Sequence, residues 1–294
     1  MSTALGLRRQ VTVGSLTLDV TDDAGVTWLT TDLKGWRASP ATTLAVTQRP
    51  ADHGGWASPN PKLVPRQLEL ELLIGAPSAS AADTAYEQLI AAVDVGPLTL
   101  TVTEGGLTRT VTCYRNGGVL PQADGGFWTT YSVPLICPDP RRYGATRSAT
   151  VFLPFSTGGL SWPVSWPISW PATTVTGDAV LPGTGTCATS PAVTIYGPTS
   201  GTTPLTAPLL LFTAPDGTVS TLAYTDTIGV GDWLVIDCAA RTVLYNGQAT
   251  RRALLQITGG WPVVPAAGSS LMTFRAATYD ASSRAVVSYR PAWM

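Results

Sequence analysis

Short runs of alternating apolar and polar residues fill most of the chain, a pattern typical of β-strands that bury one face. The clearest run covers residues 65–75, in which three leucines alternate with Glu69 and Glu71. Turn signals separate the runs, among them Gly14-Ser15 and Asn246-Gly247. The pattern predicts antiparallel strands joined by tight turns, with the two glutamates on a solvent-facing side.

One segment has a helical period instead. Apolar residues recur at i, i+3, i+4 and i+7 from Tyr86 to Val93, and Ser78 or Ser80 can cap the first turn. We therefore predict a single helix over about residues 80–93, packed on an otherwise all-β first domain.

The segment from residue 48 to residue 65 is rich in proline and glycine, which permit neither a long helix nor a central strand. It is predicted to be a long exposed loop, and loops of this length in compact domains are commonly functional. We take Gln48, Arg49, His53 and Trp56 as its candidates for a partner interface.

Composition supports the β assignment and limits the function. Only 13% of the 294 residues are charged, while glycine (29) and proline (24) provide many turns. The net charge of −1 gives no chain-wide basic surface, so sequence-specific nucleic-acid binding is not expected. No apolar run approaches the ~18 residues of a transmembrane helix, so membrane insertion is not expected either.

The sequence offers few residues or motifs that could support catalysis. His53 is the only histidine, which excludes a three-histidine zinc site and any mechanism that needs two imidazoles. Nucleophile-elbow, P-loop and calcium-loop motifs do not occur. We expect no enzyme activity, no cofactor and no metal site. An enzyme that cleaves glycans with acidic residues is the least favoured alternative.

Four widely spaced cysteines, Cys113, Cys137, Cys187 and Cys238, sit in apolar or threonine-rich contexts. We interpret them as small buried residues in strands. Disulfides need an oxidising compartment, and no signal peptide is visible, so none is expected.

Charge is distributed unevenly. Residues 148–240 contain no lysine or arginine, and near the start of this stretch Trp-Pro repeats at Trp162, Trp166 and Trp170. A proline at every fourth position forbids a helix and favours an extended path. The predicted organisation is a first domain of residues 1–146, a Trp-Pro interdomain segment of residues 147–172 and a second β domain of residues 173–294.

The three repeat tryptophans are predicted to pack in grooves of a neighbouring domain or subunit, which makes them further interface candidates. Tryptophan faces also stack on sugar rings, so a carbohydrate platform is the alternative. Separately, Trp233 and Trp261 in the second domain are the candidates for sugar contact if the chain is a carbohydrate-binding module.

Four motifs, in this order and over nearly the whole chain, resemble the distal tail protein (Dit) family of long-tailed (siphovirus) bacteriophages. They are the PDPRRY sequence of residues 138–143, the Trp-Pro repeat, the GDWLVIDCAARTVLYNG sequence of residues 231–247, and the final VVSYRPAWM.

That resemblance implies a tail-tube-like β-sandwich or split barrel followed by a galectin-like β-sandwich. It implies a homohexameric ring, a virion structural protein that joins the major tail tube protein to the tail-tip hub or tail-associated lysin protein, with the tape measure protein as a further partner. It places the protein in the virion tail tip, and in the host cytoplasm during assembly. A carbohydrate-binding module that contacts the host cell surface is the alternative function.

Overall fold

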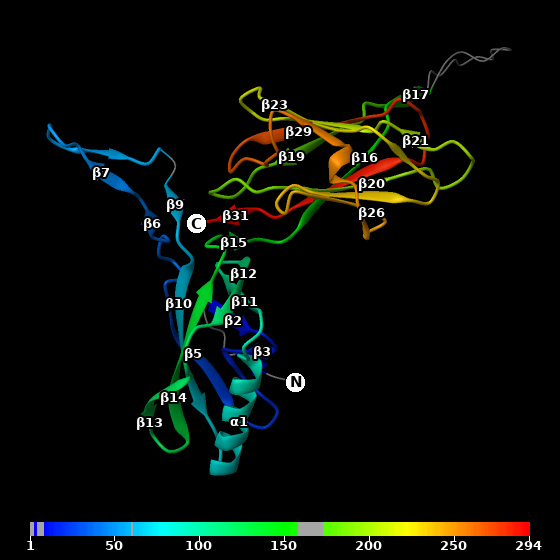
Figure 1. The fold of residues 1–294 in the computed structure, drawn as a ribbon. Coiled ribbons are helices and arrows are strands. Elements are labelled where there is room, and N and C mark those ends of the chain that lie inside the picture. Colours follow the sequence, from blue (N-terminus) through cyan, green and yellow to red (C-terminus); the bar gives the residue numbers. More distant parts are fainter. Residues whose placement is uncertain (1–2, 5–8, 60, 158–172) are drawn as a thin grey trace, which may run out of the picture. The chain divides into compact units, whose positions relative to one another are not determined.

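The computed structural model describes residues 3–4, 9–59, 61–157 and 173–294. The Trp-Pro repeat with Trp162, Trp166 and Trp170 lies outside the described residues. The chain divides into two compact units, Met1–Gly144 with Met294, and Ala145–Trp293 (Figure 1).

Among its described residues, the first unit contains one helix and many strands. In chain order its elements are β1 (Thr3–Ala4), β2 (Arg9–Val13), β3 (Leu16–Thr17), β4 (Val20–Thr21), β5 (Thr27–Lys34), β6 (Thr42–Thr43), β7 (Val46–Gln48), β8 (Gly55–Ala57), β9 (Lys62–Leu63), β10 (Arg66–Gly75), α1 (Ala79–Ala92), β11 (Leu98–Glu104), β12 (Leu107–Arg115), β13 (Leu120–Asp124), β14 (Trp128–Cys137) and β15 (Arg142–Tyr143).

The second unit is built of strands with one short 3-10 helix. Its elements are β16 (Arg147–Phe152), β17 (Phe155–Thr157), β18 (Thr173–Val175), β19 (Asp178–Pro182), β20 (Ala192–Tyr196), β21 (Leu205–Thr206), β22 (Leu209–Thr213), β23 (Val219–Tyr224), β24 (Thr227–Ile228), β25 (Trp233–Asp237), β26 (Thr242–Tyr245), β27 (Ala249–Thr250), η1 (Arg252–Leu254), β28 (Leu255–Thr258), β29 (Ser269–Arg275), β30 (Arg284–Tyr289) and β31 (Ala292–Trp293).

A long curved sheet forms the first unit, with strand order β1-β4-β5-β10-β14-β12-β11-β2-β3. Its central strand β10 alternates as the sequence predicts, because Leu68, Leu70 and Leu72 are buried while Glu69 and Glu71 lie on the other face. Lys34 on the adjacent strand bonds both carboxylates, at 3.2 Å and 2.5 Å. The two glutamates therefore form a surface ion-pair cluster and not an acid–base pair.

Helix α1 begins one residue earlier than predicted, and Ser78 is its cap, accepting a hydrogen bond from the Ala81 N–H at 3.3 Å. Ala85 and Leu89 face the core, and Tyr86 stacks on Tyr131 with ring centroids 5.5 Å apart. The helix confirms the sequence prediction. It could be predicted because its period, cap and end are all set by neighbouring residues.

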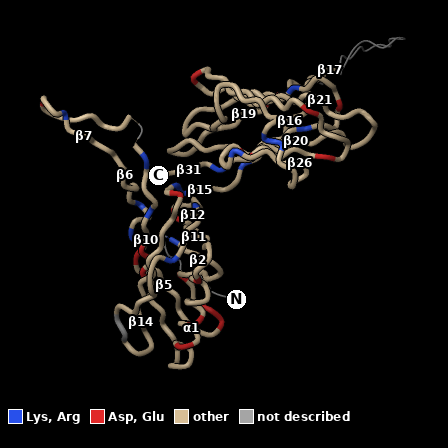
Figure 2. Tube along the Cα trace, in the orientation of Figure 1, with Lys and Arg blue, Asp and Glu red and all other residues tan. Residues whose placement is uncertain are grey.

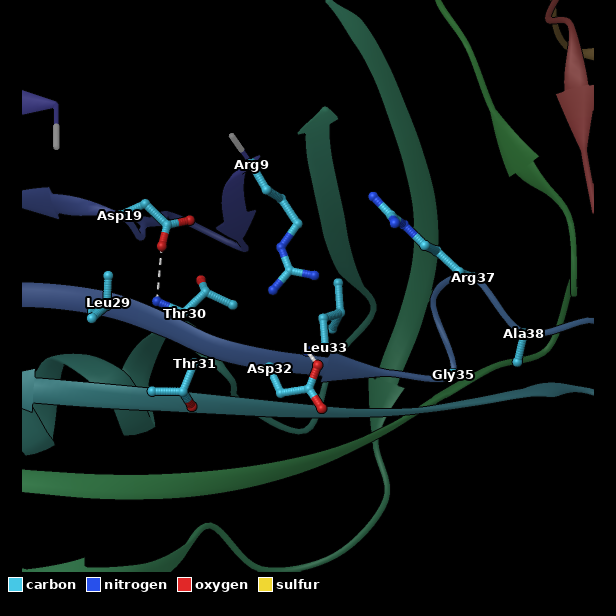
Figure 3. Close-up of a pocket in the computed structure, with 10 residues that line it drawn as sticks. All are labelled: Arg9, Asp19, Leu29, Thr30, Thr31, Asp32, Leu33, Gly35, Arg37 and Ala38. Carbon is cyan, nitrogen blue, oxygen red and sulfur yellow. Dashed lines mark hydrogen bonds between the residues drawn. The ribbon is translucent and has the colours of Figure 1, made fainter. Parts of the chain in front are cut away.

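Over the strands that the structure describes, the sheet of the first unit does not close into a complete barrel. Strand β4 pairs with β5 only at Thr27 and Trp28, and the side chain of Asp19 bridges the gap beyond them. Its carboxylate accepts the N–H of Val11 from β2 at 3.2 Å and the N–H of Thr30 from β5 at 2.8 Å. An open groove of 810 Å³ runs along this seam (Figure 3). The first unit is thus a split barrel.

Two sheets face each other across one hydrophobic core in the second unit. Their strand orders are β16-β30-β20-β25-β26-β27 and β19-β29-β22-β23-β28. The two units together confirm the predicted fold class, an all-β protein with one helix in its first half.

The second unit begins earlier than the predicted residue 173. Strand β16 pairs along its whole length with β30, and β17 pairs with β18, so residues 147–157 belong to the second unit and not to an interdomain segment. The loss of positive charge after Arg147 marked the boundary in the sequence. The alternation that buries Val151 and Leu153 is too short to have been distinguished from a linker.

Charged residues are sparse over much of the second unit, where Figure 2 shows long tan stretches. Threonine, serine and glycine cover that surface instead. Among the described residues, no helix is long and apolar enough to cross a membrane.

Candidate partner-binding surfaces

A two-stranded arm, residues 41–64, projects from the sheet of the first unit (Figure 1). It is built from the pairs β6–β9 and β7–β8. The prediction of a loop in this region is wrong, although its exposure is as expected. The paired residues of β7–β8 end at Gln48 and Gly55, so the prolines stay outside the ladder, where a missing N–H costs no strand pairing.

The arm has no core of its own. None of its described residues is buried, and Val46 and Trp56 are 60% and 57% exposed. Val46 lies directly opposite Ala57 on one face, whereas Trp56 lies opposite Thr47 on the other face. An isolated two-stranded hairpin is marginally stable in water, and this one exposes apolar side chains on both of its faces.

The candidate residues predicted from the sequence gather at the tip of this arm. Arg49 lies over the Trp56 ring at 5.7 Å and pairs with Asp52 at 3.7 Å. Gln48 pairs with Gly55 in the ladder, and His53 is exposed in the turn. The structure therefore brings Gln48, Arg49, His53 and Trp56 into one local surface; their role as an interface stays a prediction.

A buried arginine anchors the base of the arm. Arg66 is 2% exposed, and its guanidinium donates to the main-chain oxygens of Gly35 at 2.8 Å, Ala38 at 2.6 Å and Pro140 at 2.8 Å. Burial lowers its pKa below the ordinary value. With no carboxylate among its hydrogen-bond partners, the charge is stabilised by carbonyl dipoles, and one side chain ties the end of β5 to the segment after β14.

Close approach at this anchor requires a glycine. Gly35 has a φ of +79°, and a Cβ atom there would lie 2.2 Å from the main-chain oxygen of Gln67. The turn between β5 and the arm can therefore approach β10 this closely only because residue 35 has no side chain.

The PDPRRY motif closes the first unit through a compact ion-pair cluster. Asp139 accepts from Arg141 Nε and Nη2, both at 2.9 Å, and from the Tyr143 hydroxyl at 2.6 Å. Burial acts to raise the pKa of Asp139, but these hydrogen bonds outweigh it and hold the pKa below its ordinary value. The motif thus has a structural role at the end of the unit.

A second surface lies on the outer face of the six-stranded sheet in the second unit. Neighbouring strands place Phe152 opposite Arg284, Arg284 opposite Tyr196, and Tyr196 opposite Trp233. The Arg284 guanidinium lies 4.6 Å from the centre of the Tyr196 ring, while Phe152 and Trp233 are each 38% exposed. We call these four residues the aromatic row.

Trp233 in this row is positioned by the GDWLVIDCAARTVLYNG motif. The Asp232 carboxylate accepts from the Tyr245 hydroxyl and from Asn246 Nδ2, both at 2.7 Å, and the Asn246 side-chain oxygen accepts the Trp233 N–H at 2.9 Å. Hydrogen bonds from Tyr245 first and Asn246 second lower the pKa of Asp232. These hydrogen bonds fix the conformation of the turn beside the aromatic row.

The two tryptophans proposed from the sequence for carbohydrate do not share one surface. Trp233 belongs to the six-stranded sheet, whereas Trp261 follows β28 of the five-stranded sheet. Arg252 lies over the Trp261 ring at 5.1 Å, and this ring packs against the core. Sequence analysis missed Phe152, Tyr196 and Arg284, because only strand register brings them beside Trp233.

The described residues hold no group of three or more histidine, cysteine, aspartate or glutamate side chains that could bind a metal ion. The two surfaces offer ring faces, guanidinium groups and apolar side chains. Such groups serve binding.

Comparison with known proteins gives a match to solved structures. No protein-family model matches the sequence, and no curated protein matches it. The crystal structure of the Dit protein of phage SPP1, described as a paradigm of the hub adsorption apparatus in phages that infect Gram-positive bacteria, is similar over 97% of this chain and 99% of its own, with a TM-score of 0.68 and 13% identity. A chain of the phage P2 baseplate in its activated conformation aligns over 97% of this chain and 98% of its own, with a TM-score of 0.49 and 10% identity. The likeness to SPP1 Dit confirms the resemblance at the level of the fold.

Replacing Arg66 by methionine is expected to destabilise the first unit by about 3 kcal/mol, because buried main-chain carbonyls lose charged donors. Urea unfolding measures the loss, and hydrogen exchange should show faster exchange in residues 35–40 at the base of the arm. Arg37→Met is the matched control, since the Arg37 side chain is 80% exposed and its partner Glu104 keeps a second ion pair with Arg109. Equal stabilities of the two variants would contradict the anchoring role.

Proposed function

We propose that this chain is a structural protein of a phage tail, a distal tail protein whose homohexameric ring joins the tail tube to the tail-tip hub. The supporting observation is the fold match to SPP1 Dit, which spans almost the whole of both chains. Both halves of the architecture that the family resemblance implies are present here, the split barrel with its helix and the two-sheet sandwich.

The surfaces of the chain suit such an assembly. A ring forms when one face of a subunit binds a different face of the next and the rotation closes, so each subunit needs two extended contact areas. With 13% charged residues the chain carries little charge to desolvate in such contacts. The proposed partners are the chain itself, the major tail tube protein, the hub or tail-associated lysin protein, and the tape measure protein.

The arm is proposed as the contact to an adjacent tail component. Val46 and Trp56 offer apolar area on opposite faces, which suits insertion between two surfaces better than lying flat on one. Covering them would supply the burial that the hairpin itself lacks.

We expect the purified protein, alone or with a partner present, to have a mass of six times 30.7 kDa, about 184 kDa, in light scattering. Negative-stain imaging should show a six-fold ring with a central channel. A protein that remains a monomer, alone and with its tail partners, would refute the ring.

Deleting residues 51–61, or replacing Val46 and Trp56 by serine, is expected to block joining of rings to the adjacent tail component. Electron microscopy of phage particles that carry the change measures this as missing or broken tails. Trp233→Ser, which removes a partly exposed tryptophan from the other unit, is the control and should leave tails normal. Normal rings and tails in the arm variants would rule out the proposed contact.

The aromatic row favours a second candidate function, saccharide binding at the host surface. Exposed Trp233 and Phe152 rings offer apolar faces for sugar rings, and Arg284 offers donors for hydroxyl groups between them.

Titration with neutral oligosaccharides that contain galactose, glucose or N-acetylglucosamine is expected to change tryptophan fluorescence in a saturable manner. Trp233→Ser should abolish the change, whereas Trp56→Ser, in the arm, should retain it. No response to any of these sugars, or a response that survives Trp233→Ser, would exclude this role for the row.

A further inference from the structure

Two cysteines far apart in the sequence face each other inside the first unit. Strands β12 and β14 pair antiparallel through Tyr114 with Ile136 and Arg115 with Leu135. One step further in the same register sets Cys113 opposite Cys137. Residues opposite each other in antiparallel strands point to the same face, with Cβ atoms about 4.5–5.5 Å apart. Both side chains are completely buried in the same core, and both are thiols in this structure.

The two sulfurs are also chemically distinct. A hydrogen bond between the thiols lowers the pKa of Cys113 and raises that of Cys137. The thiolate is the form that attacks a disulfide, and we take Cys113 as the attacking sulfur of the pair. Arg66, which pairs with Cys137 across β10 and β14, adds a buried positive charge beside the pair.

The position of the pair gives a crosslink a structural effect. Strand β12 pairs with β11 over seven residues, from Leu107 to Cys113, but with β14 over two. Cys113 and Cys137 lie at this short junction, where the two halves of the sheet meet. A covalent bond here would reinforce one of the short strand pairings of the sheet.

We propose that Cys113 and Cys137 form a cross-strand disulfide site that closes by exchange with a small-molecule disulfide of the glutathione type. The Cys113 thiolate attacks one sulfur of that disulfide, forms a mixed disulfide and releases one small thiolate. Cys137 then gives up its proton and attacks the Cys113 sulfur, which releases the second small thiol. Two protein thiols are oxidised, one small disulfide is reduced to two thiols, and the two protons go to these thiols.

A phage particle that leaves a reducing cytoplasm meets an oxidising medium, so the disulfide would form after release from the host. This timing rests on the proposed function. The disulfide itself depends only on the geometry of the first unit, and its test needs no ring, tail or host.

The experiment equilibrates the full chain in glutathione buffers from fully reduced to largely oxidised, with refolding from urea included so that burial does not limit access. Mass spectrometry should show a loss of two hydrogen atoms, and peptide mapping should join residues 113 and 137. The thermal midpoint of the first unit should rise by about 5–10 °C, the range for closing a loop of about 25 residues.

Matched variants decide the assignment. Cys113→Ser should lose both the mass change and the shift in thermal midpoint. Cys238→Ser should retain both, because this thiol lies in the second unit, where burial raises its pKa to about 12. Persistent mixed disulfides with glutathione, a crosslink through Cys238, or a pair that remains reduced in the most oxidising buffer would each overturn the proposal.

Discussion

A buried guanidinium that donates to main-chain carbonyls is the interaction on which the first unit depends. Arg66 joins three segments, the turn after β5, the first residue of β10 and the segment after β14. The planar fork of an arginine suits this task, because its donors point in fixed directions and remain charged when burial lowers the pKa. The arm and the closing PDPRRY segment therefore share one anchor. The exposed arm is held in place by the buried Arg66 side chain.

The two candidate surfaces lie on different units and differ in how each is supported. The arm presents apolar side chains that its own hairpin cannot bury, which suits permanent contact within an assembly. The aromatic row is supported by a complete sheet beneath it and stays stable when unoccupied, which suits reversible contact. Low charge serves both, since few ionic groups need to be desolvated. The thiol pair adds a site where covalent chemistry can strengthen the unit that carries the arm.

Local signals made much of the fold predictable. Helix α1 follows from its period and its serine cap, and the turn at Gly14-Ser15 joins paired strands as expected. Strand β10 buries its leucines because alternation is a property of the strand itself. The prediction of a loop over residues 48–65 was wrong, although its proline and glycine signals are also local. Proline excludes central strands, but an arm with two free edges needs only a few paired residues between its prolines.

The fold class, the helix, the lack of catalytic motifs and the exposure of the arm residues could all be predicted from the amino-acid sequence, because each rests on neighbours within one turn or one strand. Which distant residues meet became clear from the folded chain. Arg66 bonds Pro140 across 74 positions, Cys113 faces Cys137, and Trp233 joins Phe152, Tyr196 and Arg284. These contacts depend on strand order and register, and a register is selected by the packing of a whole sheet against its core rather than by any segment alone.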